Sequence, residues 1–99
     1  MKIVSSSEFD NEIKNGIVFV DFYADWCGPC KMMTPIIEEI EKEFSNIKFI
    51  KVNVDESEDI AMRYGIMSIP TFYLFKDGQV SKKVVGGHSK QEMIDFINI

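Results

Sequence analysis

The two cysteines of this 99-residue chain lie three positions apart, at Cys27 and Cys30, and the sequence contains no others. The pair follows an almost wholly apolar run, Ile17 to Tyr23, and precedes a long segment with apolar residues at helical spacing. This order predicts a strand, a tight turn containing Gly28 and Pro29, and a helix that begins at the cysteines. This placement matters for the chemistry of the thiols, because the positive end of a helix favours a thiolate over a thiol.

The spacing of the two cysteines suits a disulfide that opens and closes. Residues three apart on a helix have Cβ atoms ~5–6 Å apart. A small adjustment brings that separation within disulfide distance, so that little backbone movement is needed. The pattern therefore predicts thiol–disulfide exchange.

Length and composition predict a single domain of common size that spans residues 1–99. Hydrophobic residues make up 45% of the chain and aromatic residues 12%, which is enough for a hydrophobic core. Charged residues, at 27%, are ordinary for a folded protein. The net charge of −5 gives no support for nucleic-acid binding, which favours a basic face.

The N-terminal segment predicts a cytoplasmic protein. Residues 1–8 contain one lysine and lack the apolar stretch of a signal peptide. No apolar run approaches the ~20 residues of a membrane span, so we expect no membrane association. We also expect a monomer. In a reducing compartment, a C-x-x-C pair is more often catalytic or metal-binding than structural.

Apolar periodicity predicts strands that alternate with helices. The expected strands are Ile3–Val4, Ile17–Tyr23, Ile47–Val54, Thr71–Phe75 and Gln79–Val84. The expected helices are Glu8–Asn15, Cys27 or Gly28 to Phe44, Ser57–Tyr64, and a last helix that opens at Ser89 and carries Met93, Ile94 and Ile97.

Capping, turn and breaker residues divide these elements. Ser6 or Ser7 is expected to cap the first helix. Pro35 lies inside the second helix and is expected to kink it. The pair Asp77-Gly78 predicts a hairpin turn between the last two strands.

The order of elements, βαβαβα followed by ββα, predicts an α/β fold. Its central mixed sheet has four to five strands and is flanked by about four helices. Helix-connected strands run parallel with right-handed crossovers, and the hairpin adds antiparallel strands at an edge. Ligands of such sheets bind beyond the carboxyl ends of the strands, where Cys27 follows Tyr23.

The positions of the two thiols predict different roles. Cys27 is closer to the helix end and is expected to be more exposed, so it is the candidate nucleophile that forms a mixed disulfide with a target. Cys30 lies one turn further in, is expected to be more buried, and would resolve that intermediate. Half of a zinc site is the alternative, but zinc prefers four ligands. The only other soft ligand is His88, which lies far along the chain and is expected in a loop.

Asp21 is a lone carboxylate inside the apolar strand 17–23. Burial disfavours the charged form, so we expect a raised pKa for Asp21. At the strand end next to the thiols, such a carboxyl can pass protons to and from Cys30. The alternative is a buried Asp with a structural role only.

Several motifs resemble the thioredoxin family, in the expected order and over essentially the whole chain apart from a shortened N-terminus. They are Val20-Asp21-Phe22-Tyr23-Ala24 with Trp26-Cys27-Gly28-Pro29-Cys30-Lys31, then Ile69-Pro70-Thr71, Phe75-Lys76-Asp77-Gly78, and Val85-Gly86. A C-x-x-C pair beside a βαβ pattern is typical of this class. The chain departs from the family at Tyr23, where many members carry Trp, and in the loop Gly86-Gly87-His88.

The resemblance implies the thioredoxin fold and protein-disulfide reductase activity, with the same roles for the two cysteines. It implies that Pro70 is cis and faces the disulfide, while the backbone at Ile69 pairs with an extended target segment. It also makes Lys51 a candidate neighbour of Asp21. Gly86 is expected to keep the docking groove shallow.

Two exposed apolar side chains complete the expected docking site. Trp26 and Met67 are expected to add an apolar rim, although ordinary surface exposure is an equal alternative for Met67. The residues between the cysteines, Gly28 and Pro29, tune redox poise. They resemble those of reducing thioredoxins, whereas isomerases of the same fold often carry Gly-His, so we expect a reductant.

The resemblance implies no bound cofactor, because the electrons reside in the dithiol of the reversible Cys27–Cys30 disulfide. The implied partners are disulfide-containing protein substrates and a thioredoxin reductase that is flavin-dependent with NADPH, or ferredoxin-linked in some lineages. Two alternatives are a dedicated donor that serves one reductase, like a glutaredoxin in role, and a docking module in which the thiols are incidental.

Overall fold

Strands and helices alternate along the chain in the computed structural model, which describes residues 1–98. The strands are β1 (Lys2–Ile3), β2 (Ile17–Tyr23), β3 (Ile47–Asn53), β4 (Thr71–Lys76) and β5 (Gln79–Val85). The helices are α1 (Ser6–Ile13), α2 (Gly28–Glu43), α3 (Glu58–Arg63) and α4 (Lys90–Ile97).

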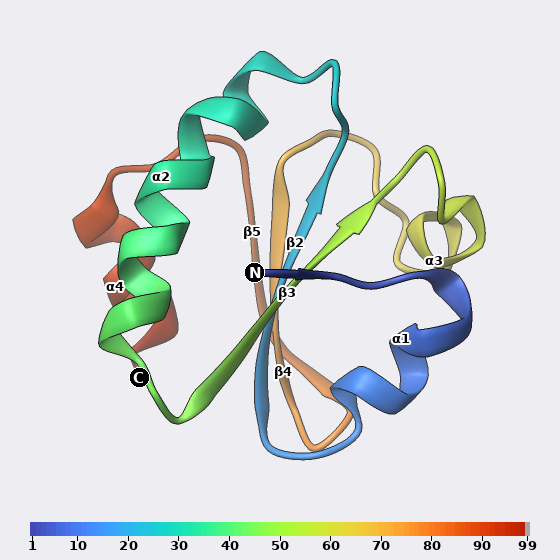
Figure 1. The fold of residues 1–99 in the computed structure, drawn as a ribbon, viewed down its shortest axis with the longest axis horizontal. Helices are drawn as coiled ribbons and strands as arrows, with labels where there is room; N and C mark the ends of the chain where they lie inside the picture. The colour runs from blue at the N-terminus through green and yellow to red at the C-terminus, as the bar shows by residue number, and fades with distance from the viewer. Residues whose placement is uncertain (99) are drawn as a thin grey trace.

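The five strands form one mixed sheet in the order β1-β3-β2-β4-β5. Strand β3 pairs in parallel with both β1 and β2, whereas β4 is antiparallel to β2 and β5 is antiparallel to β4. The parallel half joined to an antiparallel hairpin confirms the predicted fold class. Strand β2 lies at the centre of the sheet, which is the strand that leads to the cysteines (Figure 1).

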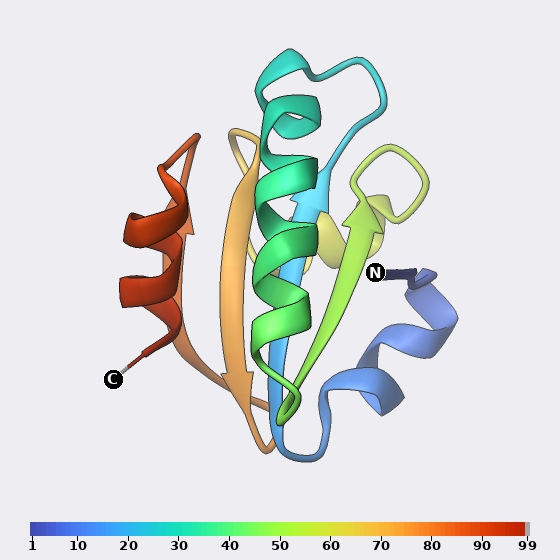
Figure 2. The same cartoon turned by 60° about the vertical axis from the view of Figure 1, so that its left-hand side comes forward.

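The helices cover the sheet from both sides. Helices α1 and α3 lie over one face, and α2 and α4 lie over the other (Figures 1 and 2). On the first face, Phe9 of α1 packs 6.4 Å from Phe22 of β2, measured between ring centroids. On the second face, Phe19 of β2 packs 5.0 Å from Phe49 of β3. Because β2 is covered on both faces, its sequence is apolar throughout except at Asp21, rather than alternating between apolar and polar residues.

The N-cap residues of two helices test the predicted helix starts. Ser5 occupies the N-cap position of α1, so the prediction of a cap at Ser6 or Ser7 is wrong. The physical reason is the reach of Glu8, whose carboxylate accepts a hydrogen bond from the Ser5 backbone N–H at 3.2 Å. The cap predicted at Ser89 is confirmed, since its hydroxyl accepts from the Glu92 N–H at 3.1 Å.

Turns and breakers also follow from local residue chemistry. Asp77 and Gly78 connect β4 to β5 with φ of 49° and 83°, which confirms the hairpin turn. Helix α2 runs from Gly28 to Glu43 with Pro35 inside it, and the predicted kink there stays a prediction.

Among residues 1–98, no helix combines the length and apolar character needed to cross a membrane.

Candidate active site

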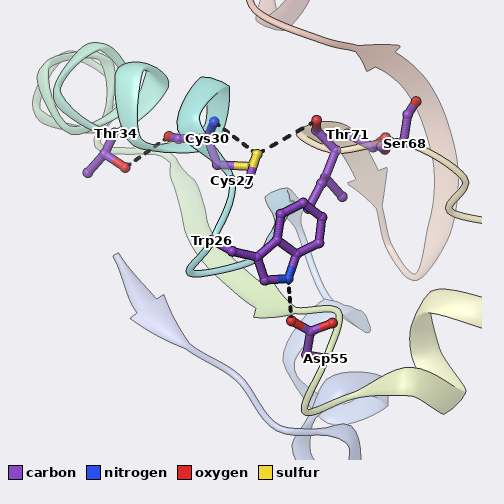
Figure 3. The surroundings of a disulfide bond; sticks show 8 residues. Trp26, Cys27, Cys30, Thr34, Asp55, Ser68 and Thr71 are labelled. Atoms are coloured by element: carbon purple, nitrogen blue, oxygen red, sulfur yellow. Dashed lines mark hydrogen bonds between the residues drawn. A yellow bond between two sulfur atoms is a disulfide. The ribbon is translucent and has the colours of Figure 1, made fainter.

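The two cysteines lie where β2 gives way to α2, beyond the carboxyl end of the central strand. Cys27 is the N-cap residue of α2, and Pro29 lies in the first turn of that helix, a position that suits proline. The first turn of α2 therefore lies next to the sulfurs. Cys27 and Cys30 form a disulfide with their Cα atoms 5.3 Å apart (Figure 3). The predicted reversible pair is thus present in its oxidised form.

The backbone around the sulfurs treats the two cysteines differently. The Cys30 N–H donates a hydrogen bond to Cys27 Sγ at 3.2 Å. Cys27 Sγ also lies 3.8 Å from the Ile69 carbonyl oxygen, on the facing loop. A backbone N–H aimed at Cys27 from the first turn of α2 favours negative charge on that sulfur after reduction.

Exposure does not distinguish the two cysteines in the disulfide form. Cys27 is 3% exposed and Cys30 is 4% exposed, so the expectation that Cys27 would be the more accessible is wrong here. Both cysteines pack in one cluster with Tyr23 and Ala24, and Ile69 lies against the cluster. Helix position rather than exposure is what separates the two sulfurs.

The loop that precedes β4 brings the predicted docking residues to the disulfide. The Ile69–Pro70 peptide bond is cis, as the resemblance implied. The Pro70 carbonyl accepts a hydrogen bond from the Gly86 N–H at 2.8 Å, which fixes the two loops together. Gly86 has a φ of 92°, a conformation that favours glycine, and a Cβ there would project into open space. Ile69, Pro70 and Gly86 therefore lie side by side near Cys27.

An apolar groove of about 290 Å³ opens next to this loop. Its lining consists of Trp26, Val54, Ile66, Met67, Ser68 and Ile69. Trp26 is 70% exposed, yet its indole N–H donates to the Asp55 carboxylate at 2.8 Å (Figure 3). Met67 is 96% exposed at the groove wall. Two large apolar side chains thus remain in solvent within one groove, which is typical of a docking surface.

A separate cavity of about 280 Å³ connects Asp21 with Cys30. Lys51 and Tyr23 also line it, so the structure brings together the three residues Asp21, Lys51 and Cys30 that the sequence analysis linked. Asp21 is 2% exposed, and its Oδ1 has no hydrogen-bond partner. Burial raises the pKa of Asp21 to about 7, while the charge of Lys51 acts in the opposite direction.

Two contributors to the site escaped the sequence analysis. Asp55 is not among the predicted site residues, yet its carboxylate accepts a hydrogen bond from the indole N–H of Trp26. Tyr23 enters the sequence analysis only as a departure from the family, yet its ring lies 4.1 Å from the Lys51 Nζ. The period of two along a strand is the signal for the second contact, because it places Tyr23 on the same face as Asp21.

His88 lies in the loop between β5 and α4, as expected. Its ring Nε2 is 3.0 Å from the Val85 carbonyl oxygen, and its backbone N–H donates to Met33 Sδ at 3.4 Å. Within residues 1–98, His, Cys, Asp and Glu side chains form no group of three or more that could hold a metal ion.

Comparisons with known proteins agree with this geometry. The thioredoxin family model matches residues 1–99. The chain is 47% identical to a thioredoxin of Chlamydia caviae, over 99% of this chain and 96% of that protein. It is 42% identical to a thioredoxin of Bacillus subtilis, over 99% and 97% respectively. A Plasmodium falciparum thioredoxin structure superposes with a TM-score of 0.92 at 40% identity, covering 98% of this chain and 96% of that one.

A disulfide at the start of the helix that follows the central strand defines a thiol–disulfide oxidoreductase. The chain belongs to the thioredoxin family, and its activity is that of a protein-disulfide reductase. The structural match extends to mitochondrial thioredoxin 3 of Saccharomyces cerevisiae in its oxidized form, with a TM-score of 0.90, 39% identity, and coverage of 98% of this chain and 92% of that one.

The buried carboxyl of Asp21 makes folding stability depend on pH. Its pKa is about 7 in the folded chain against 3.8 as the ordinary value, so the folded state holds the extra proton between these values. The stability that this proton provides is complete below pH 3.8 and is lost as pH rises through about 7. We expect Asp21→Asn to raise the free energy of unfolding at pH 8 by about 1–3 kcal/mol and to flatten its pH dependence.

Urea unfolding of the oxidised protein from pH 5 to pH 8 measures this effect. Asp95→Asn is the matched control, because Asp95 is exposed on α4 and should leave the pH profile as it is. An Asp21→Asn protein that unfolds more easily than the wild type at pH 8 would contradict the buried-acid account.

Proposed function

We propose that this chain is a general cytoplasmic electron donor that reduces disulfides in many target proteins. It acts as a monomer, with residues 1–99 as one domain. The observation that carries the proposal is the Cys27–Cys30 disulfide at the start of α2, facing the Ile69–Pro70 loop beside an open apolar groove. A groove with apolar walls fits varied targets better than a charged pocket specific for one small substrate.

In the first step, the Cys27 thiolate attacks a sulfur of the target disulfide. The target S–S bond breaks, a Cys27–target bond forms, and the released target thiolate takes up a proton. The Cys30 N–H that points at Cys27 Sγ supports this assignment, because it stabilises negative charge on Cys27. Gly28 and Pro29 set the redox poise by fixing the turn in which both sulfurs lie.

The target docks as an extended segment along the loop that faces Cys27. The backbone at Ile69 offers a strand-like partner, and Pro70 and Gly86 border it. Target side chains next to the scissile disulfide enter the groove between Trp26 and Met67. Main-chain pairing gives affinity without regard to sequence, which suits a donor with many targets.

In the second step, Cys30 resolves the mixed disulfide. Asp21 accepts the proton of the Cys30 thiol through the cavity that they share, and Lys51 modulates the acidity of Asp21. The Cys30 thiolate then attacks Cys27 Sγ, which closes the Cys27–Cys30 disulfide and releases the second target thiolate. Asp21 returns its proton to that leaving sulfur, so protons and electrons balance.

A separate reductase returns two electrons to the disulfide after each cycle. We propose a thioredoxin reductase that draws these electrons from NADPH through a flavin, with a ferredoxin-linked enzyme as the alternative. The chain itself needs no bound cofactor for this, because the two sulfurs carry the electrons.

Serine variants of the two cysteines separate the proposed roles. Cys27→Ser should abolish reduction of insulin disulfides with dithiothreitol as the electron source, because the nucleophile is lost. Cys30→Ser should instead accumulate a mixed disulfide with the target, visible by mass spectrometry. If Cys27→Ser retained the biological activity of the chain, the docking-module alternative would replace the reductase role.

The proposed proton transfer predicts a slower second step in Asp21→Asn. Stopped-flow kinetics should show mixed-disulfide formation near the wild-type rate, but resolution by Cys30 slowed by on the order of 100-fold, the lower end of what a general base contributes. A variant that resolves the mixed disulfide at the wild-type rate would assign Asp21 a structural role only.

A reducing role predicts that the oxidised form is the more stable. When a folded dithiol is a better reductant than an unfolded one, folding favours the disulfide by the same free energy, ~1.4 kcal/mol for each 30 mV. Oxidised protein should therefore melt at a higher temperature than protein reduced with excess dithiothreitol. Equal melting temperatures would indicate an oxidase-like poise instead.

A further inference from the structure

We propose that Tyr23 is a positioning residue for the Asp21–Cys30 proton transfer. Its ring holds the Lys51 ammonium group away from the Asp21 carboxyl, and it thereby keeps Asp21 able to bind a proton when Cys30 ionises. This inference rests on the proposed role of Asp21 in the second step. It concerns Tyr23, one of the two places at which the sequence departs from the family pattern.

The register of the sheet places the three side chains together. Asp21 of β2 lies opposite Lys51 of β3, in a parallel pair. Tyr23 is two residues further along β2, so its side chain projects from the same face as Asp21. All three line the cavity that reaches Cys30. A lysine in this register has two candidate partners, the carboxylate opposite it and the ring beyond.

The Lys51 ammonium contacts the ring rather than the carboxylate. Its Nζ lies 4.1 Å from the centroid of the Tyr23 ring. The structure contains no ion pair within 4.0 Å between Lys51 and Asp21, and Asp21 Oδ1 has no hydrogen-bond partner. Lys51 therefore acts on the charge of the ionised Asp21 carboxylate only from a distance, without an ion pair.

The attraction between Lys51 and Tyr23 comes from the ring face. Burial raises the pKa of the Tyr23 phenol above its usual range, so the hydroxyl stays neutral. An ammonium over an aromatic ring is attracted by the ring quadrupole, more strongly where water is excluded. Without the ring, the same ammonium would gain most by approaching the Asp21 carboxylate across the low-dielectric cavity.

The remaining groups around the cavity do not take the place of Lys51. Helix α2 contributes Cys30, Thr34 and the exposed Lys31, and the loop after β2 contributes the exposed Asp25. Glu56, also exposed, lies on the Tyr23 side and acts on its phenol. Exposed charges are screened by solvent, so half-buried Lys51 is the cation with the largest effect on Asp21.

Replacement of the ring tests the proposal. In Tyr23→Leu, the carboxyl-carbon NMR titration of Asp21 should shift to lower pH by on the order of one unit. Tyr23→Phe and Tyr23→Trp keep a ring face and should leave the Asp21 titration within about 0.3 units of the wild type. An unchanged or raised Asp21 pKa in Tyr23→Leu would overturn the proposal.

A double-mutant comparison separates the effect of the Lys51 ammonium on the Asp21 pKa from the effect of water entering the cavity. Leu is smaller than Tyr, and added water in the cavity would also lower the Asp21 pKa. In a Lys51→Met background, Tyr23→Leu should therefore have no further effect on the titration. The same downward shift in both backgrounds would show that water entry, not the ammonium, is responsible, and would overturn the proposal.

A readout in the wild-type protein keeps the proposal testable even if Tyr23→Leu folds poorly, and a kinetic readout applies if that variant folds. In the wild-type protein, the Lys51 Hε resonances should be shifted upfield by the ring current of Tyr23, and unshifted resonances would overturn the proposal. The pH profile of mixed-disulfide resolution in Tyr23→Leu should move downward with the Asp21 titration. A titration that shifts while Asp21→Asn resolves at the wild-type rate would support Tyr23 as positioning Lys51 and refute only the proton-transfer role.

Discussion

The structure depends on burial of β2 on both faces. Phe22 on one face and Phe19 on the other each anchor a separate hydrophobic layer, so the central strand cannot shift without disrupting both. The residues of the active site lie at or just beyond the carboxyl end of β2. Asp21 is buried because the strand is, and Cys27 lies at a helix start because α2 must leave the strand there to cover the sheet.

The burial that stabilises the fold also disfavours the ionised form of Asp21. Ionised Asp21 lowers folding stability, since its carboxylate lies among apolar neighbours with an unpartnered oxygen. The same environment brings its pKa close to physiological pH, where a proton acceptor is most useful. A fully paired Asp21 would be less destabilising and a poorer base. The cavity that Asp21 and Cys30 both line connects this unfavourable carboxylate to the reacting sulfur.

Much of the fold and of the central chemistry was predictable from local pattern. The strand that ends at Tyr23 and the C-x-x-C pair after it are contiguous in sequence, so their geometry follows from secondary structure alone. The cis state of the Ile69–Pro70 bond followed only from the family resemblance, because spacing does not distinguish cis from trans proline.

Contacts between distant segments were the ones that sequence did not predict. The bond from Trp26 to Asp55 joins residues 29 positions apart, and no periodicity relates them. The equal exposure of Cys27 and Cys30 depends on packing by Ile69, from a loop some forty residues later. The first-helix cap fell one residue outside the prediction, because three consecutive serines offer equivalent hydroxyls and only Glu8 selects among them.

The position of Trp26 has a practical consequence. It is the only tryptophan in the chain, and it stands in the apolar groove, tethered by Asp55. The intrinsic emission of the molecule therefore originates almost entirely from the surface onto which a target would settle. Occupancy of that surface is visible in the native chain, without an attached dye.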